Sequence, residues 1–233
     1  MCHRDRLSSL PEPASYTEIN GDIDALVFGG TDNQRRIAIL PDIYGANPFY
    51  QSFSTYLADK GSQVFLVNPF SKLEELPEVT REAAFERRHK VMDKTYLDQL
   101  EVFLKEQDIN AVVGFCLGGT WVLELARRGY TDELVAYYPF PQGLPNADAI
   151  PTPLDYMADI NTPVTVLMGW EDDRVGTEVT EQTVAIAAQN SNLKLKVYDG
   201  SAHGFLTDLE SDNELLAANA QDSLDICTAQ LFT

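Results

Sequence analysis

The chain has 233 residues, of which 44% are hydrophobic and 23% are charged, and its formal net charge is −19. This size and apolar content are typical of one folded domain, and the strong negative charge argues against nucleic-acid binding, which depends on clustered Lys and Arg. No apolar run reaches the roughly 18 residues needed to span a bilayer, so we expect a cytoplasmic protein without membrane contact.

Short β-branched runs alternate with longer amphipathic runs along the chain. This alternation predicts a three-layer α/β fold with a mostly parallel sheet and helices on both faces. We expect a single domain over residues 1–233, with residues 1–15 as a loosely ordered extension. The predicted strands are 36–41, 63–69, 110–115, 133–139, 163–169 and 193–200, and the predicted helical runs are 48–61, 81–106, 118–129, 177–190 and 213–231.

Two stretches interrupt this alternation, residues 69–80 and the proline-rich residues 139–163. Open α/β sheets bind ligands at the carboxyl ends of their strands, and each stretch could form a wall over that edge. The alternative for each is a plain surface connection.

The segment "GFCLGG", residues 114–119, falls where a strand should end and a helix should begin. A nucleophile on such a sharp turn needs small neighbours, which Gly114 and Gly118 provide. The turn places Cys116 at the helix N-terminus, beside the backbone N–H of Leu117, which can face a developing oxyanion. Cys116 is therefore predicted to be a nucleophile; the alternative is a buried core cysteine.

A nucleophilic thiol requires a base, and the chain has three histidines. We expect His3 to lie in a frayed terminus and His89 on a solvated helix face. His203 follows the last predicted strand and should return to the carboxyl edge, so it is the predicted base, with a turn-stabilising histidine as the alternative.

The acid that orients the histidine should follow a strand between nucleophile and base. The segment "MGWEDDRV" offers Glu171, Asp172 and Asp173 at that place. Asp172 is preferred and Asp173 is the second choice. The acids that are not used would be solvated or capping groups.

Taken together, "LPDIYGAN", "GFCLGG", "MGWEDDRV" and "AHGF" resemble the dienelactone hydrolase (carboxymethylenebutenolidase) family of α/β-hydrolases. The resemblance implies a hydrolase without cofactor or metal that acts on a small-molecule lactone or activated ester. Cys116 would attack the carbonyl, His203 would relay protons and Asp172 would orient the imidazole. The backbone N–H groups of Ile43 and Leu117 would form the oxyanion hole.

Two positions depart from the family's pattern. The family has a glutamate beside the thiol where this chain has Asp42, which is a candidate for thiol activation or else a turn or N-cap residue. The family binds the substrate carboxylate with two arginines, because a guanidinium matches a carboxylate. Arg81 stands at one of these positions, as a candidate substrate-binding residue or a solvated helix start, and Thr207 stands at the other.

Other functions stay open at this point. A thioesterase or another carboxylesterase could use the same scaffold, and a non-catalytic redox or ligand sensor could use Cys116 only as a reactive thiol. The three cysteines, Cys2, Cys116 and Cys227, are too far apart for a disulfide framework or a metal site. The sequence does not choose between a monomer and a small homo-oligomer.

Overall fold

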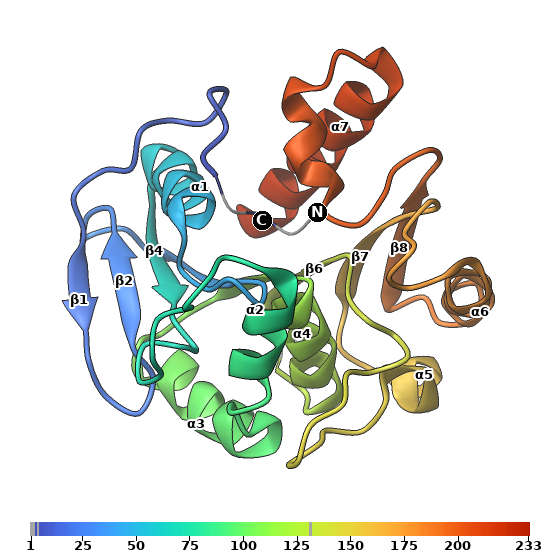
Figure 1. Ribbon diagram of the computed structural model, residues 1–233, viewed down its shortest axis with the longest axis horizontal. Coiled ribbons are helices and arrows are strands. Elements are labelled where there is room, and N and C mark those ends of the chain that lie inside the picture. The colour runs from blue at the N-terminus through green and yellow to red at the C-terminus, as the bar shows by residue number, and fades with distance from the viewer. Residues whose placement is uncertain (1–2, 4, 131) are drawn as a thin grey trace.

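One eight-stranded sheet lies at the centre of the protein, in the order β1-β2-β4-β3-β5-β6-β7-β8 (Figure 1). The computed structural model describes residues 3, 5–130 and 132–233. β1 (Thr17–Ile19) and β2 (Ala25–Phe28) pair antiparallel, and β2 is also antiparallel to β4. The other pairs are parallel, which confirms the predicted mostly parallel sheet. They join β3 (Arg35–Leu40), β4 (Ser62–Val67), β5 (Ala111–Phe115), β6 (Glu133–Tyr137), β7 (Val164–Gly169) and β8 (Leu193–Tyr198).

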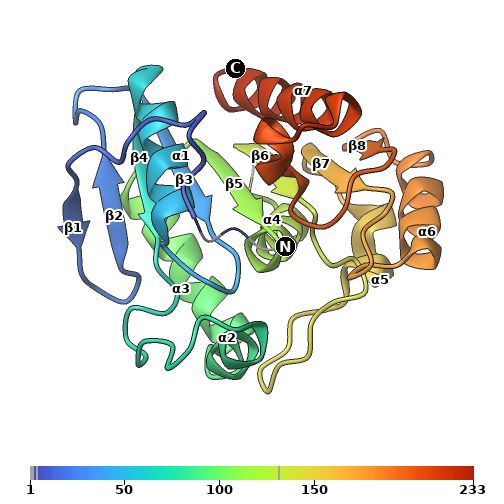
Figure 2. The same cartoon turned by 45° about the horizontal axis from the view of Figure 1, so that its top comes forward.

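Helices cover both faces of the sheet. α1 and α7 pack on one face, and α3 and α4 pack on the other (Figures 1 and 2). The helices are α1 (Pro48–Asp59), α2 (Arg81–Arg88), α3 (Asp93–Glu106), α4 (Leu117–Arg127), α5 (Pro153–Tyr156), α6 (Thr177–Ala187) and α7 (Glu214–Leu231), with 3-10 turns η1 (Met157–Asp159) and η2 (Phe205–Glu210). No helix in the described part of the chain has both the length and the apolar character needed to cross a membrane.

The central strands are buried because both of their faces are covered. Every residue of β4, β5 and β7 is buried, as the uninterrupted apolar runs predicted. β8 lies at the sheet edge, and its buried and exposed residues alternate in part, with Lys194 exposed. Charged side chains on an edge strand discourage pairing with other chains.

Two sequence expectations need correction. The helical run predicted over 81–106 is two helices, because the chain turns at residues 89–92 and α3 restarts at Asp93, which is buried against Arg88. Residues 1–15 were expected to be loosely ordered, but the described part of this segment packs on the protein. His3 and Leu10 are buried, and Ser8 Oγ donates to Glu210 Oε1 at 2.7 Å.

Candidate active site

The loops that follow four parallel strands carry the residues expected to act together. Asp42 and Ile43 follow β3, Cys116 follows β5, Asp172 follows β7 and His203 follows β8. These strands run parallel, so their carboxyl ends meet at one edge of the sheet, where α/β proteins bind their ligands.

Cys116 lies on a strained turn between β5 and α4. Its φ of 57° and ψ of −110° fall where L-residues are rarely found. The strained backbone is held on both sides, because Cys116 N–H donates to Tyr137 O at 3.0 Å and Cys116 O accepts from Thr120 N at 3.0 Å. Cys116 is therefore the N-cap residue of α4, with the positive end of the helix dipole beside its side chain.

The glycines around Cys116 are required by close backbone contacts. A Cβ on Gly114 would lie 2.1 Å from Gly118 O, and a Cβ on Gly118 would lie 2.0 Å from Leu40 O. Gly119 has a similar constraint, since its Cβ would lie 2.6 Å from Tyr137 O. The start of α4 thus packs directly against β3 and β6, and this packing explains the spacing of the "GFCLGG" segment.

His203 and Asp172 form a buried pair. His203 Nδ1 lies 2.7 Å from Asp172 Oδ2, and the two side chains are 4% and 0% exposed. The other carboxylate oxygen of Asp172 accepts the backbone N–H groups of Arg174 at 2.9 Å and Val175 at 3.2 Å. The carboxylate is thus fixed by its own loop, which orients the imidazole.

The two acids beside Asp172 point elsewhere. Glu171 is exposed, and the Asp173 side chain is 73% exposed and pairs with Arg174 Nε at 3.2 Å. Of the three acids that the sequence offers, the structure pairs Asp172 with His203. Asp173 has the role of a solvated loop acid.

Gly169 allows the acid loop and the histidine loop to approach each other, a role that the sequence reasoning missed. A Cβ on Gly169 would lie 2.2 Å from Ser201 O, and Glu171 N–H donates to the same oxygen at 2.9 Å. The only sequence signal is that this glycine ends a buried apolar run. The contact itself is made with a segment about thirty residues away.

The oxyanion-hole candidates lie on two of these loops. Ile43 and Leu117 are each 1% exposed, and Leu117 is the first residue of α4. Among the described residues, no acceptor forms a hydrogen bond with the backbone N–H of either residue. Both N–H groups are therefore available as donors.

Asp42 is wholly buried, and its carboxylate accepts backbone N–H groups. Oδ1 accepts from Tyr44 at 2.8 Å, and Oδ2 accepts from His3 at 2.9 Å. The first bond is the Asx-turn geometry that the sequence alternative described. The N-cap of α1 is Asn47, so Asp42 is not a helix cap.

His3 is the main site residue that the sequence reasoning set aside. Instead of fraying, it is wholly buried, and its ring stacks on Phe49 at 3.9 Å and forms a hydrogen bond with Tyr138 Oη. Burial lowers the pKa of His3 well below the usual value, so its ring is neutral. The Tyr138 ring also packs against the His203 ring, with 5.2 Å between the two ring centres. No motif surrounds His3, so only the tertiary structure reveals its position.

Arg81 and Thr207, at the two positions where the family pattern has carboxylate-binding arginines, are less buried than the residues described above. Arg81 is exposed at the first turn of α2, where its guanidinium lies 5.1 Å from the centre of the Phe85 ring. Thr207 is half-buried in η2 and donates its hydroxyl to Gly204 O at 3.0 Å. A role for Arg81 in substrate binding stays a prediction.

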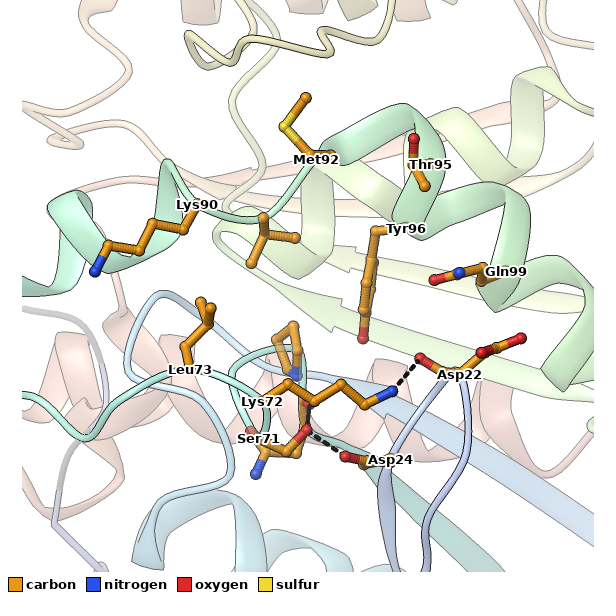
Figure 3. Close-up of a pocket in the computed structure, with 13 residues that line it drawn as sticks. Asp22, Asp24, Ser71, Lys72, Leu73, Lys90, Met92, Thr95, Tyr96 and Gln99 are labelled. Carbon is orange, nitrogen blue, oxygen red and sulfur yellow. Dashed lines mark hydrogen bonds between the residues drawn. The ribbon is translucent and has the colours of Figure 1, made fainter.

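Arg87 supports one loop of the site, whereas one cavity of the protein lies apart from the expected catalytic residues. Arg87, at the other end of α2, donates to the carbonyl oxygens of Ile43 and Tyr44 at 3.2 and 3.3 Å and so holds the loop after β3. A cavity of about 260 Å³ lies elsewhere, and its lining includes Asp22, Lys72 and Tyr96 (Figure 3). None of the expected catalytic residues lines this cavity.

Among the described residues, neither Cys227 nor any group of possible metal ligands forms a second candidate site. Cys227 lies buried on α7, and burial raises the pKa of its thiol to about 12, so it is protonated near neutral pH. In the part of the chain that the structure describes, no three His, Cys, Asp or Glu side chains gather as metal ligands would. Cys2 lies outside the described residues.

Residues 23–229 match the model of the dienelactone hydrolase family. The chain belongs to the dienelactone hydrolase family. It is 45% identical over 233 residues to carboxymethylenebutenolidase 2 of Cupriavidus pinatubonensis, covering 100% of this chain and 99% of the relative. It is 29% identical over 217 residues to a carboxymethylenebutenolidase of Rhodococcus opacus, covering 91% and 83% of the two chains.

A solved structure from Klebsiella pneumoniae, a candidate dienelactone hydrolase, superposes with a TM-score of 0.80 at 19% identity, over 94% of this chain and 98% of that one. That likeness confirms the α/β-hydrolase fold. The two sequence relatives confirm the predicted enzyme class, a hydrolase of carboxylic ester bonds.

Proposed function

We propose that this dienelactone hydrolase family member opens an enol lactone by nucleophilic catalysis, with Cys116 as nucleophile, His203 as proton relay and Asp172 as orienting acid. The observation that carries the proposal is the arrangement of Cys116 on a strained helix start and a buried Asp172–His203 pair at the same edge of the sheet. The names of the two relatives support a lactone as the substrate class. The catalytic unit is a single α/β-hydrolase domain.

The first half of the reaction acylates the thiol. His203 accepts the Cys116 proton as Sγ attacks the lactone carbonyl, and the backbone N–H groups of Ile43 and Leu117 stabilise the negative oxygen that forms. The ring C–O bond then breaks, and the leaving oxygen takes the proton from His203. The product is an acyl thioester on Cys116 that still contains the former alcohol as an enol.

The second half returns the enzyme to its starting state. His203 accepts a proton from water as that water attacks the thioester, and then gives the proton to the departing sulfur. Asp172 stabilises the imidazolium in both halves and holds its Nδ1–H in the required tautomer. No cofactor takes part in this sequence of steps, and one water is consumed for each lactone opened.

Asp42 is a candidate for controlling the resting thiol. Its buried carboxylate is one residue from Ile43, and Arg87 interacts with it electrostatically. A negative charge at this place would favour a protonated thiol before substrate binds, whereas the helix dipole favours a thiolate. Arg81 stays a candidate for binding the substrate's carboxylate.

A substrate panel tests this proposal. We expect the wild-type enzyme to hydrolyse cis- or trans-dienelactone with a kcat/KM at least about 10-fold above that for uncharged lactones and p-nitrophenyl esters, because a carboxylate-binding arginine adds transition-state binding for the anionic substrates. Steady-state rates for the four substrate classes provide the measurement. A preference for uncharged esters would contradict the substrate assignment and favour a general carboxylesterase.

A further inference from the structure

His3 lies at the carboxyl edge of the sheet, beside the segments that carry the expected catalytic residues. Its backbone N–H donates to Asp42 Oδ2 at 2.9 Å, and its carbonyl oxygen accepts from Asn47 Nδ2 at 2.7 Å. The centre of its ring lies 5.8 Å from that of Phe115, the residue before Cys116. A histidine of the N-terminal segment is thus fixed to the loop that also carries one of the two oxyanion-hole candidates.

The N-terminal segment that follows His3 is anchored to the rest of the protein. Ser8 Oγ donates to Glu210 Oε1 at 2.7 Å, and Ala14 N–H donates to Thr55 Oγ1 in α1 at 2.9 Å. Figures 1 and 2 show this blue segment beside α1. The position of His3 is therefore part of the folded structure.

The ring of His3 is connected to the proton relay through Tyr138. His3 Nε2 forms a hydrogen bond with Tyr138 Oη, and both side chains are buried. The Tyr138 ring lies edge-on to the His203 ring, and the Phe140 ring packs against the same imidazole with 5.2 Å between the ring centres. The hydrogen bond from Asp172 fixes one atom of the imidazole, so these two rings restrict its rotation about that bond.

Tyr138 also has a strained backbone. Its φ of 34° is rarely adopted by L-residues, and its N–H donates to Leu167 O at 2.7 Å. Among the described non-glycine residues, only Asp108, Cys116 and Tyr138 have a positive φ, and Asp108 precedes β5 at the opposite edge of the sheet. Such strain persists where the surrounding contacts enforce it, and it is concentrated at active sites.

We propose that His3 is a positioning residue for His203: its ring anchors the Tyr138 hydroxyl, and the Tyr138 ring restricts the rotation of the imidazole. This inference rests on the proposed function, in which His203 relays the proton. Without the anchor, the Tyr138 side chain could adopt other rotamers, and the imidazole would meet the Cys116 thiol in a productive geometry less often. Because burial lowers the pKa of His3, its neutral ring does not oppose the positive charge that His203 carries during the reaction.

Two variants of His3 separate this role from a contribution to packing. His3→Phe keeps a flat ring for stacking on Phe49 but cannot form the hydrogen bond with Tyr138. It is expected to lower kcat for trans-dienelactone about 5- to 20-fold and to change KM less than 3-fold, because the orientation of the imidazole changes while substrate binding does not. His3→Gln has an amide that can donate or accept, so its kcat should be within about 3-fold of the wild-type value.

His89→Phe is the matched control, since it makes the same change at an exposed histidine. Its kcat and KM should each stay within about 3-fold of the wild-type values. Undiminished kcat in His3→Phe, or equal losses in His3→Phe and His3→Gln, would overturn the proposal.

Tyr138→Phe removes the same hydrogen bond from the other side and covers the case in which His3→Phe does not fold. It should lower kcat at least about 5-fold. The double variant with His3→Phe should lose no more than about a further 2-fold, because the interaction is already absent. Undiminished kcat in Tyr138→Phe, or losses that multiply in the double variant, would contradict the anchoring role of His3.

A spectroscopic measurement distinguishes this inference from the proposed function. The chain has three histidines, so labelling with ¹⁵N-histidine gives few imidazole signals. The Nδ1–H of His203, buried against Asp172, should give one sharp proton resonance in the wild type. That resonance should broaden in His3→Phe and stay sharp in His89→Phe.

The two proposals can then fail separately. If the resonance of His203 broadens in His3→Phe but the wild-type enzyme does not hydrolyse lactones, the reaction assignment fails and the positioning role of His3 stands. If lactone hydrolysis is efficient but neither the resonance nor kcat changes in His3→Phe, only the role of His3 fails.

Discussion

Asp172→Asn is expected to lower kcat/KM for lactone hydrolysis about 10³- to 10⁴-fold while leaving the protein folded. Asp172 Oδ2 pairs with His203 Nδ1 at 2.7 Å in a buried environment. An asparagine can present its NH₂ group to that nitrogen, which would select the wrong imidazole tautomer and remove the charge that stabilises the imidazolium. Steady-state kinetics with trans-dienelactone, together with thermal unfolding of the variant, provide the measurement.

Asp173→Asn is the matched control for this prediction. It makes the same chemical change one residue along the chain, at a side chain that is 73% exposed and pairs with Arg174 at 3.2 Å. Its kcat/KM should stay within about 3-fold of the wild-type value, because an exposed ion pair contributes little. A larger loss in Asp173→Asn than in Asp172→Asn would contradict the assignment of the acid.

Gly118→Ala is expected to have the largest effect on stability, with a loss of more than about 4 kcal/mol in the free energy of unfolding or no soluble protein at all. The added Cβ would lie 2.0 Å from Leu40 O and 2.8 Å from Leu40 Cβ. Relief requires α4 to move away from β3, which would also displace the N–H of Leu117. Urea unfolding followed by circular dichroism provides the measurement.

Gly129→Ala is the control for the glycine effect. Gly129 follows α4 with a φ of +82°, and nothing lies within 4 Å of its Cβ position. This substitution adds only backbone strain, so it should cost about 1–2 kcal/mol. If Gly118→Ala costs no more than Gly129→Ala, the close packing of the elbow against β3 does not constrain residue 118.

The parallel part of the sheet and the elbow could be predicted from the sequence because their signals are local. Each buried strand is a continuous apolar run bounded by polar residues or turns. The glycines of "GFCLGG" indicate a tight turn whatever the following helix packs against. The β1–β2 hairpin was not predicted, since strands of three and four residues show too little alternation. The break between α2 and α3 was also missed, because the first N–H groups of α3 donate to Asn146 and Asp148, which lie about fifty residues further along the chain.

The site was predictable only in part, because the positions of its side chains depend on how the loops fold. The order of nucleophile, acid and histidine along the chain narrows the choice to the "WEDD" segment, but only the fold of that loop turns Asp172 inward and Asp173 outward. His3 carries no local signal, because it is a histidine in a terminal segment and its burial depends on elements elsewhere in the chain.

The most direct test of the central claim is whether an acyl group forms on Cys116. Wild-type enzyme and Cys116→Ala would each be mixed with trans-dienelactone, quenched in acid within milliseconds and analysed by intact-protein and peptide mass spectrometry, with turnover measured in parallel. We predict an adduct of the lactone's mass on the Cys116 peptide in the wild type, no adduct in Cys116→Ala, and a fall in kcat of at least about 10⁴-fold in that variant. Undiminished turnover by Cys116→Ala, or an adduct of the same mass in it, would contradict the proposed role of Cys116.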